Sequence, residues 1–227
     1  MANWEDFDDE QYDDSDEFDT EMISFGSKPA RVPLALTCLA AFAGIFFAAT
    51  STADFIAHLD RQMHAVHCSV LPGGAAALGD SGCRAVMMSP YSSWFRDLYW
   101  GGIPISLFAV AVFSFIAYRS AYLLWRGRPH RTESIFLFVA TLLPVVLSVI
   151  YGNIAARELG AMCTVCVGIY VVSGVLFAST LATVFMSETP EIVGGEGAAA
   201  HFAVGVLEGV AFVAVLTIAY IIGMPQV

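Results

Sequence analysis

The sequence predicts an all-α integral membrane protein with about five spanning helices. Hydrophobic residues make up 57% of the 227 residues and charged residues only 14%, and the mean hydropathy is +0.69. Soluble domains of this size are less apolar and more highly charged. Four stretches also supply the roughly 20 apolar residues that a hydrocarbon core of about 30 Å requires, and a fifth is slightly shorter. We therefore expect the chain to fold within a bilayer.

Apolar runs predict the spans at residues 33–57, 102–125, 133–151, 162–186 and 200–223. Pro33 opens the first span, and Pro104 lies in the first turn of the second, where a missing backbone donor costs little. Pro144 interrupts the third span and is expected to bend it. The chain shows no internal repeat, which predicts one membrane domain with a tail.

Residues 1–27 differ in composition from the rest of the chain. Eleven of the 21 acidic residues lie between Glu5 and Glu21, and the other ten balance the ten Lys and Arg, so this segment accounts for the formal net charge of −11. A segment with few aliphatic residues cannot bury enough surface to offset its ordering entropy, which predicts a disordered tail. It lacks the basic and apolar regions of a cleavable signal peptide, so the first span is interpreted as an uncleaved anchor.

Lys and Arg near the ends of the spans predict the orientation. Six of them precede the first span or lie around the link between the second and third, and four lie elsewhere. Because basic residues favour the cytoplasmic side, the N-terminus is assigned to the cytoplasm of a multi-pass protein of the cell inner (cytoplasmic) membrane. The loop 58–101 and the turn 152–161 then face outward. The predicted parts are the tail 1–27, a membrane domain 28–186, and a linker with the fifth helix, 187–227.

Cys163 and Cys166 open the fourth span as a Cys-x-x-Cys pair. Three residues apart on a helix, they share one face, and the backbone donors of the first turn favour a thiolate there. A thiolate of lowered pKa is a good nucleophile and leaving group in thiol–disulfide exchange. The spacing by itself also allows two cysteines that pack as small hydrophobic residues.

Cys68 and Cys83 form a second pair in the loop 58–101, joined by a Gly- and Ala-rich stretch that lets them meet. Taken alone, this pair favours a structural disulfide. Two dithiols on one side of the membrane instead favour a relay, in which the loop pair receives electrons from a soluble partner and passes them to the helix pair. Cys38 lies alone in the first span and is interpreted as a packing residue.

The loop continues with a segment rich in aromatic residues. Ser89 is a good N-cap and Pro90 a good first helical residue, which predicts a short helix. Its aromatic residues fall at helical spacing and would form a face in the headgroup region: Tyr91, Trp94, Phe95 and Tyr99. A sharper hypothesis is that this helix, with Phe95, also covers a quinone pocket.

Taken together, these features resemble the vitamin K epoxide reductase family of membrane thiol oxidoreductases. The resemblance covers about residues 33–186 and rests on order and spacing. It is carried by Cys68, by Cys83 with Ser89 six residues later, by Gly102-Ile103-Pro104-Ile105-Ser106, and by Cys163-Thr164-Val165-Cys166.

The resemblance implies a four-helix bundle around a quinone, with a fifth helix outside it. It also implies that Cys166 lies next to the quinone and that Cys163 exchanges with the loop pair, with the first loop cysteine to react left open. Bacterial relatives oxidise a thioredoxin-like partner and reduce ubiquinone or menaquinone, which supports disulfide-bond formation. The expected partners are thus a periplasmic thioredoxin-like protein, quinone and membrane lipid, with no nucleic acid.

Two features depart from the family pattern. The loop cysteines are separated by fourteen residues, a longer gap than usual, and residues 96–101 look like an insertion before Gly-Ile-Pro. Insertions outside the membrane cost little, but they alter the geometry of the shuttle. The chain also ends at Val227, shortly after the fifth span, so we expect the thioredoxin-like partner to be a separate protein.

A quinone site needs an apolar pocket with one or two hydrogen-bond donors. The candidates near the outer ends of the spans are Ser89, Tyr151 and Asn153, although Asn153 can equally cap the end of the third span.

Other functional classes remain as alternatives. A zinc or copper site could use His64, His67 and the four outer cysteines, but a closed zinc site usually shows two Cys-x2-Cys knuckles and this chain has one. A transporter would need polar residues in mid-membrane, and the candidate is Glu208, which an interhelical contact would also explain.

Overall fold

The computed structural model describes residues 28–59, 86, 89–95, 101–127, 131–160, 162–187 and 195–223. Within them lie five long helices: α1 (Lys28–Leu59), α3 (Ile105–Arg126), α4 (Arg131–Ile154), α5 (Thr164–Met186) and α6 (Gly195–Gly223). A π-helix, η1 (Ala155–Leu159), continues α4, and two short strands, β1 (Ser93–Trp94) and β2 (Ile103–Pro104), precede α3. The expected tail at 1–27 and the loop cysteines Cys68 and Cys83 lie outside the described residues.

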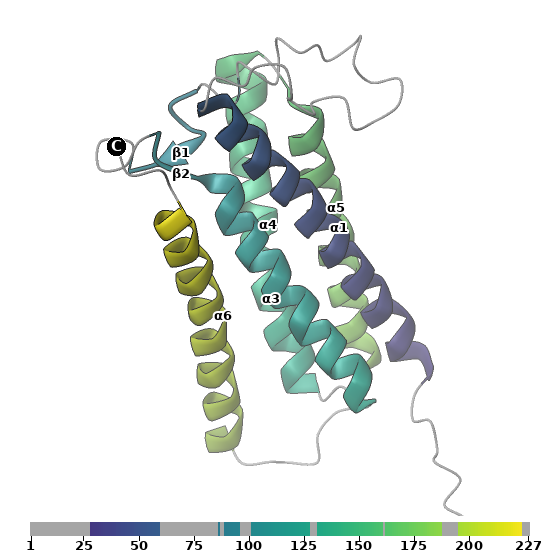
Figure 1. The fold of residues 1–227 in the computed structure, drawn as a ribbon. Coiled ribbons are helices and arrows are strands. Elements are labelled where there is room, and N and C mark those ends of the chain that lie inside the picture. The colour runs from purple at the N-terminus through teal and green to yellow at the C-terminus, as the bar shows by residue number, and fades with distance from the viewer. Residues whose placement is uncertain are drawn as a thin grey trace, which may run out of the picture.

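All five long helices are long and apolar enough to cross a membrane, which confirms the predicted all-α membrane fold. Helices α1, α3, α4 and α5 form a bundle in which α1 packs against α3 and α5, and α4 packs mainly against α5. Helix α6 stands outside the bundle and contacts α3 and, less extensively, α4 (Figure 1). Successive long helices run in opposite directions, so α1 ends where α3 and α5 begin (Figure 1).

The two prolines expected near helix starts lie at other positions than the sequence predicted. Helix α1 begins at Lys28 and contains Pro33, because a proline near a helix N-terminus removes only one hydrogen bond while its carbonyl still accepts one. The Pro33 carbonyl in fact accepts a bond from the Thr37 hydroxyl at 2.9 Å. Pro104 lies one residue before α3, as its N-cap, and belongs to β2.

Hydroxyl side chains link the helices inside the bundle. Helix α5 is bonded to α1 through Thr37 and Ser179, whose oxygens lie 2.8 Å apart. It is bonded to α4 through three pairs: Ser134 with Ser187 at 2.6 Å, Thr141 with Thr180 at 3.0 Å, and Ser148 with Ser173 at 3.1 Å. A further pair, Thr52 with Ser106 at 2.9 Å, joins α1 to α3. Such bonds are worth about 0.6 kcal/mol each in membrane bundles.

Glycines allow aromatic rings to fit between the helices. A Cβ atom on Gly44 of α1 would lie 2.7 Å from the ring of Phe113 on α3, which is fully buried. A Cβ atom on Gly168 of α5 would lie 2.8 Å from the ring of Phe47 on α1. Both contacts are closer than real Cβ atoms permit, so only glycine allows this spacing of α1, α3 and α5.

The segment after Ser89 differs from the predicted helix in its described part. Residues 89–92 form turns, and β1 pairs antiparallel with β2, with Ser93 opposite Pro104 and Trp94 opposite Ile103. The chain is helical earlier, at Val86. Two glycines with positive φ, Gly101 at 73° and Gly102 at 79°, lead into β2. This conformation, which other residues rarely adopt, lets the loop return to pair with β1.

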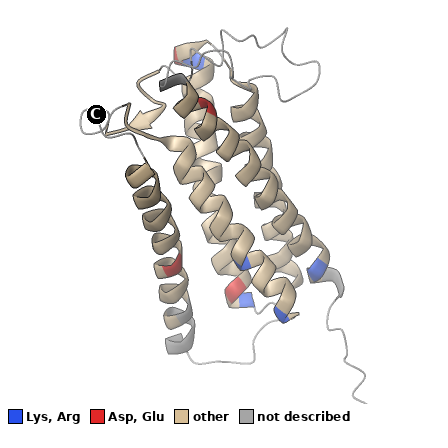
Figure 2. Cartoon of the chain, viewed as in Figure 1, with Lys and Arg blue, Asp and Glu red and all other residues tan. Residues whose placement is uncertain are grey.

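Charged residues distinguish the two ends of the bundle (Figure 2). We call the end where α1 begins and α3 ends the basic end, because it carries Arg31, Arg126 and Arg131. The opposite end, where α5 begins with the Cys-x-x-Cys pair, is called the cysteine end. Between α3 and α6, Arg119 pairs with Glu208 at 3.2 Å. Glu208 therefore makes the interhelical contact that the sequence allowed.

Replacing Gly44 with Ala tests the close packing of α1 on α3. Because the added methyl group would overlap the fully buried Phe113 ring, we expect Gly44→Ala to lower the free energy of unfolding by about 1–3 kcal/mol. The matched control is Gly174→Ala on α5, where an added Cβ atom meets nothing within 4 Å, so stability is unchanged or rises by up to about 1 kcal/mol. Thermal unfolding in detergent measures both, and equal Tm values would contradict the packing.

Candidate active site

The Cys-x-x-Cys pair is held where the chain turns from α4 into α5. The π-helix ends at Gly160, whose φ of 58° is left-handed and whose N–H bonds back to the Ala155 carbonyl. A left-handed glycine ends a helix without strain and directs the chain into the next segment. Cys163 follows in extended conformation as the N-cap of α5, and Cys166 lies in the first turn of that helix.

The two cysteines have different surroundings. Cys163 is 1% exposed and forms a small core cluster with Val165, against which Phe47 of α1 and Val86 of the loop pack. Cys166 packs against the same cluster and also lines a cavity. The N-terminus of α5 thus presents one sulfur toward the loop and the other toward the interior of the bundle.

The surroundings of Cys163 also change the pKa of its thiol. The Cys166 thiol donates a hydrogen bond to Cys163, which is the main reason that the pKa of Cys163, just outside the span, is lowered from 9.0 to about 7. The backbone N–H groups of Cys166 and Val165 lower this pKa further, whereas burial and the carboxylate of Asp54 on α1 oppose the shift. A lowered pKa makes Cys163 the better nucleophile and leaving group in thiol–disulfide exchange.

The cavity lies between α1, α3, α4 and α5 at the cysteine end and has a volume of about 150 Å³. Most of its wall is apolar, with contributions from Phe55, Phe113, Pro144 and Ile169. The polar groups that reach it are mainly hydroxyls, from Ser89, Ser106, Ser148, Tyr151 and Tyr170. An apolar wall with a few placed polar groups is typical of a site for a small apolar ligand.

The turn before β1 adds Ser89, Tyr91 and Ser92 to the cavity wall at the cysteine end, and Trp94 of β1 anchors this segment to the helices. The indole N–H of Trp94 donates a hydrogen bond to the Tyr151 hydroxyl, and the Trp94 ring packs on Phe108 with 5.0 Å between ring centres. Because Tyr151 accepts this bond, its own O–H proton can be donated elsewhere. One indole ring thus links the segment to both α3 and α4.

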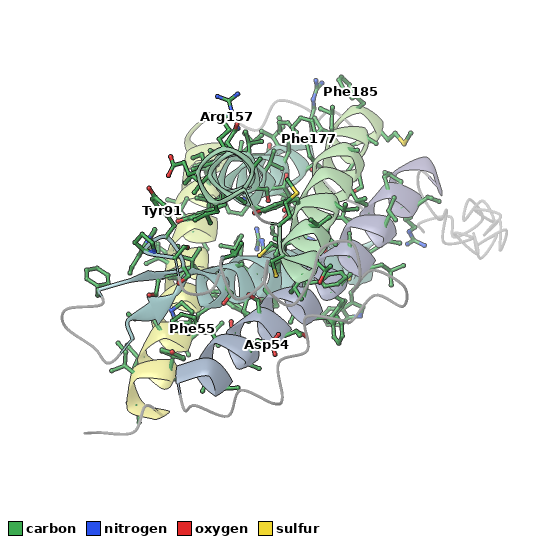
Figure 3. All side chains as sticks on the ribbon, turned by 90° about the horizontal axis from the view of Figure 1, so that it is seen from above. Asp54, Phe55, Tyr91, Arg157, Phe177 and Phe185 are labelled. Atoms are coloured by element: carbon green, nitrogen blue, oxygen red, sulfur yellow. The ribbon has the colours of Figure 1, made fainter. Side chains whose placement is uncertain are left out.

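A second contact fastens the same segment to the end of α4. Tyr91 donates a hydrogen bond to Glu158 of the π-helix, and the nearby carboxylate raises the pKa of Tyr91 above its ordinary value. Seen from above, Tyr91 lies near the π-helix that carries Arg157 (Figure 3). The Ser92 carbonyl accepts the N–H of Ile105 at 3.1 Å, which ties the turn to the start of α3.

The structure brings together three of the residues predicted from the sequence. Cys166, Ser89 and Tyr151 all line the cavity, although they come from α5, the loop and α4. The Ser89 hydroxyl donates to the Val86 carbonyl at 2.7 Å, so its proton is used within the loop. Cys163 does not line the cavity, and the loop cysteines Cys68 and Cys83 lie outside the described residues.

Asn153 and Phe95 do not line the cavity. Asn153 is exposed, and its amide donates to the Val149 carbonyl of the same helix at 3.1 Å. Residues two apart on a helix point in different directions, so Tyr151 and Asn153 cannot both face the cavity. Phe95 is 60% exposed, because the segment that carries it is a strand and turn rather than the helix that would have aligned it with Tyr91.

Sequence reasoning missed several residues of the cavity wall. Tyr170 lies four residues after Cys166, and this spacing alone places both on one face of α5. Ser106 belongs to the Gly-Ile-Pro-x-Ser motif but was not assigned to the pocket, and Ser148 gave no signal because the inward face of a long apolar helix depends on its neighbours. The π-helix, which supplies Ala155 and Leu159 to the wall, also has no sequence pattern that predicts it.

A model of the vitamin K epoxide reductase family matches residues 35–181, which include most of α1, all of α3 and α4, and most of α5. The chain belongs to this family. A search of curated protein sequences found no match. The family match spans the bundle that surrounds the cavity and ends before α6.

Membership of the vitamin K epoxide reductase family makes the chain an oxidoreductase of the membrane, in a family of thiol–disulfide oxidoreductases. It does not favour the alternative of a metal-binding protein. Within the described part of the chain, no three His, Cys, Asp or Glu side chains gather as metal ligands would. His64 and His67 lie outside that part.

The pKa of Cys163 predicts how the reduced pair titrates. Thiolate absorbance should rise with pH around a midpoint of about 7, and this step should be absent from Cys163→Ala. Cys166→Ala removes the donor that stabilises the thiolate while burial remains, so the midpoint should move upward. An unchanged midpoint in Cys166→Ala would show that the thiol hydrogen bond does not set the charge of the pair.

Proposed function

We propose that this chain passes electrons from a thioredoxin-like protein, through its cysteine pairs, to a quinone, and thereby supports disulfide-bond formation. The observation that carries the proposal is the division of the Cys-x-x-Cys pair. Cys166 lines an apolar cavity, whereas Cys163 packs toward Val86 of the loop before α3. One sulfur can therefore react with the contents of the bundle while the other exchanges with a thiol outside it.

The cavity fits a quinone ring in size and chemistry. A cavity on the order of 150 Å³ holds a single six-membered aromatic ring, and that is the volume beside Cys166. Tyr151 accepts its hydrogen bond from Trp94, so its hydroxyl proton is available to a carbonyl oxygen in the cavity. Tyr170 supplies a second hydroxyl on the same face of α5 as Cys166. When bound, a quinone would accept two electrons and two protons.

The protein supplies the electrons through its sulfur atoms. Oxidation of the dithiol joins the Cys163 and Cys166 sulfurs and releases two electrons and two protons, which match the two electrons and two protons that reduction of a quinone consumes. Attack on the Cys163 sulfur by a thiolate of the loop pair then releases Cys166, and closure of the loop disulfide regenerates the reduced helix pair. The loop pair is in turn reduced by the partner dithiol.

The loop cysteines Cys68 and Cys83 are proposed as this shuttle. Val86 follows Cys83 by three residues and packs against the cluster of Cys163 and Val165. Because Val86 lies so close in sequence to Cys83, its contact with this cluster supports the proposal that the loop pair reaches Cys163. The partner is proposed to be a thioredoxin-like protein, because exchange with a dithiol requires a low-potential thiol pair.

The orientation is proposed from the charges at the two ends. The basic end carries Arg31, Arg126 and Arg131, which favours the cytoplasm. The cysteine end would then face the oxidising side of an inner membrane, where disulfides form and persist.

Loss of Cys166 tests the proposed reaction. Purified protein in lipid vesicles, supplied with dithiothreitol and ubiquinone, should reduce the quinone, and Cys166→Ala should reduce turnover to the rate without protein because no sulfur then faces the cavity. The matched control is Cys38→Ala, which removes a half-buried free thiol of α1 and should leave turnover unchanged. Full activity of Cys166→Ala would contradict the proposed function.

Labelling from one side of the membrane tests the orientation. After reduction, a membrane-impermeant maleimide should label Cys68 and Cys83 in right-side-out but not in sealed inside-out vesicles. Thr132→Cys, in the first turn of α4 at the basic end, is the matched control and should show the opposite pattern. Labelling of the loop cysteines in inside-out vesicles would reverse the assignment.

A further inference from the structure

A second hollow lies beside the cavity, between α3, α4 and the outer helix α6. It has a volume of about 600 Å³ and an almost entirely apolar wall. We call it the α6 groove. Phe108 and Val112 of α3 line both the cavity and the α6 groove. The two residues are one helical turn apart, so the two hollows are neighbours along a full turn of α3.

The wall of the α6 groove is built by aromatic rings and glycines. Phe136 of α4 packs on Phe115 with 6.0 Å between ring centres and on Phe202 of α6 with 5.2 Å. A Cβ atom on Gly205 would lie 2.5 Å from the Phe136 ring. Glycine thus lets α6 approach these rings closely, and the salt bridge of Glu208 with Arg119 holds α6 in this position.

The volumes of the two hollows suit different parts of one ligand. Sites that enclose a drug-sized ligand measure roughly 300–1,000 Å³, whereas the cavity beside Cys166 measures about 150 Å³. It can hold a quinone ring but not a long isoprenoid tail as well. The adjoining groove has four times that volume and a wall that matches a hydrocarbon chain.

The geometry points to the α6 groove as the binding site for the isoprenoid tail of the quinone whose ring lies beside Cys166. This inference rests on the proposed function and adds a role for α6, which lies outside the part of the chain that the family model matches. The groove opens to the bilayer past Leu143 and Val210, which are 52% and 60% exposed. A long tail can therefore continue into the lipid.

A bulky residue in the α6 groove tests the inference. Val206 lines the groove and is 45% exposed, while Val204 is 52% exposed and does not line it. We expect Val206→Trp to raise the KM for ubiquinone with eight isoprenoid units by about tenfold, through lost apolar contacts. The KM for ubiquinone with one unit should stay within about twofold, and Val204→Trp should change neither.

The possible outcomes distinguish failure of the inferred tail site from failure of the proposed function. If Val206→Trp changes neither KM, changes both equally, or behaves like Val204→Trp, the tail does not occupy the groove. Continued reduction of the short-tailed quinone by the unaltered protein would in each case leave the proposed function standing. Failure of the unaltered protein to reduce either quinone would overturn both.

Photolabelling gives a readout that does not depend on turnover. In Cys166→Ala protein, a ubiquinone with a diazirine on its tail should label α6 peptides, and excess ubiquinone with eight units should abolish the labelling. Labelling that resists this competitor but falls with added phospholipid would assign the groove to lipid and overturn the inference. Labelling of other helices alone would do the same.

Discussion

The packing of α5 against α1 and α4 fixes the position of the Cys-x-x-Cys pair at the cysteine end. In a bilayer no hydrophobic gain drives helices together, so close contact and interhelical hydrogen bonds must hold the bundle. Helix α5 supplies both, through the Phe47 ring that fits against Gly168 and through its hydroxyl pairs with α1 and α4. These contacts fix the N-terminus of α5, and with it the two sulfur atoms, relative to the cavity.

The division of the two sulfurs follows from their places on this helix. Cys163 precedes the first turn and is covered by Val86 and Phe47, whereas Cys166 belongs to the turn and faces inward. The hydrogen bond that the Cys166 thiol donates lowers the pKa of Cys163. In the proposed reaction, a pair held in this way separates exchange with the loop from chemistry inside the bundle, although the sulfurs are only three residues apart.

The loop and the outer helix lie on different sides of the cavity. Trp94 bonds to Tyr151 and Tyr91 bonds to Glu158, so the segment that carries them is held beside the cavity by contacts to α4 and to the π-helix that continues it. Helix α6 contributes a groove that shares part of its wall with the cavity. A hydrogen-bonded segment therefore lies beside the cavity at the cysteine end, and an apolar groove lies beside it toward the outer helix.

The sequence by itself determined the number and order of the spans, the cysteine pair at the start of α5, and the resemblance that the family match confirms. Apolar length and motif spacing are local properties, so they can be recognised without knowing the neighbours. The tertiary structure alone decided that Tyr151 faces the cavity and Asn153 does not, that the segment after Ser89 pairs with β2, and that α6 forms a groove with α3 and α4. A cavity is the space left between helices that are distant in sequence, and its lining depends on how each helix is rotated against the others.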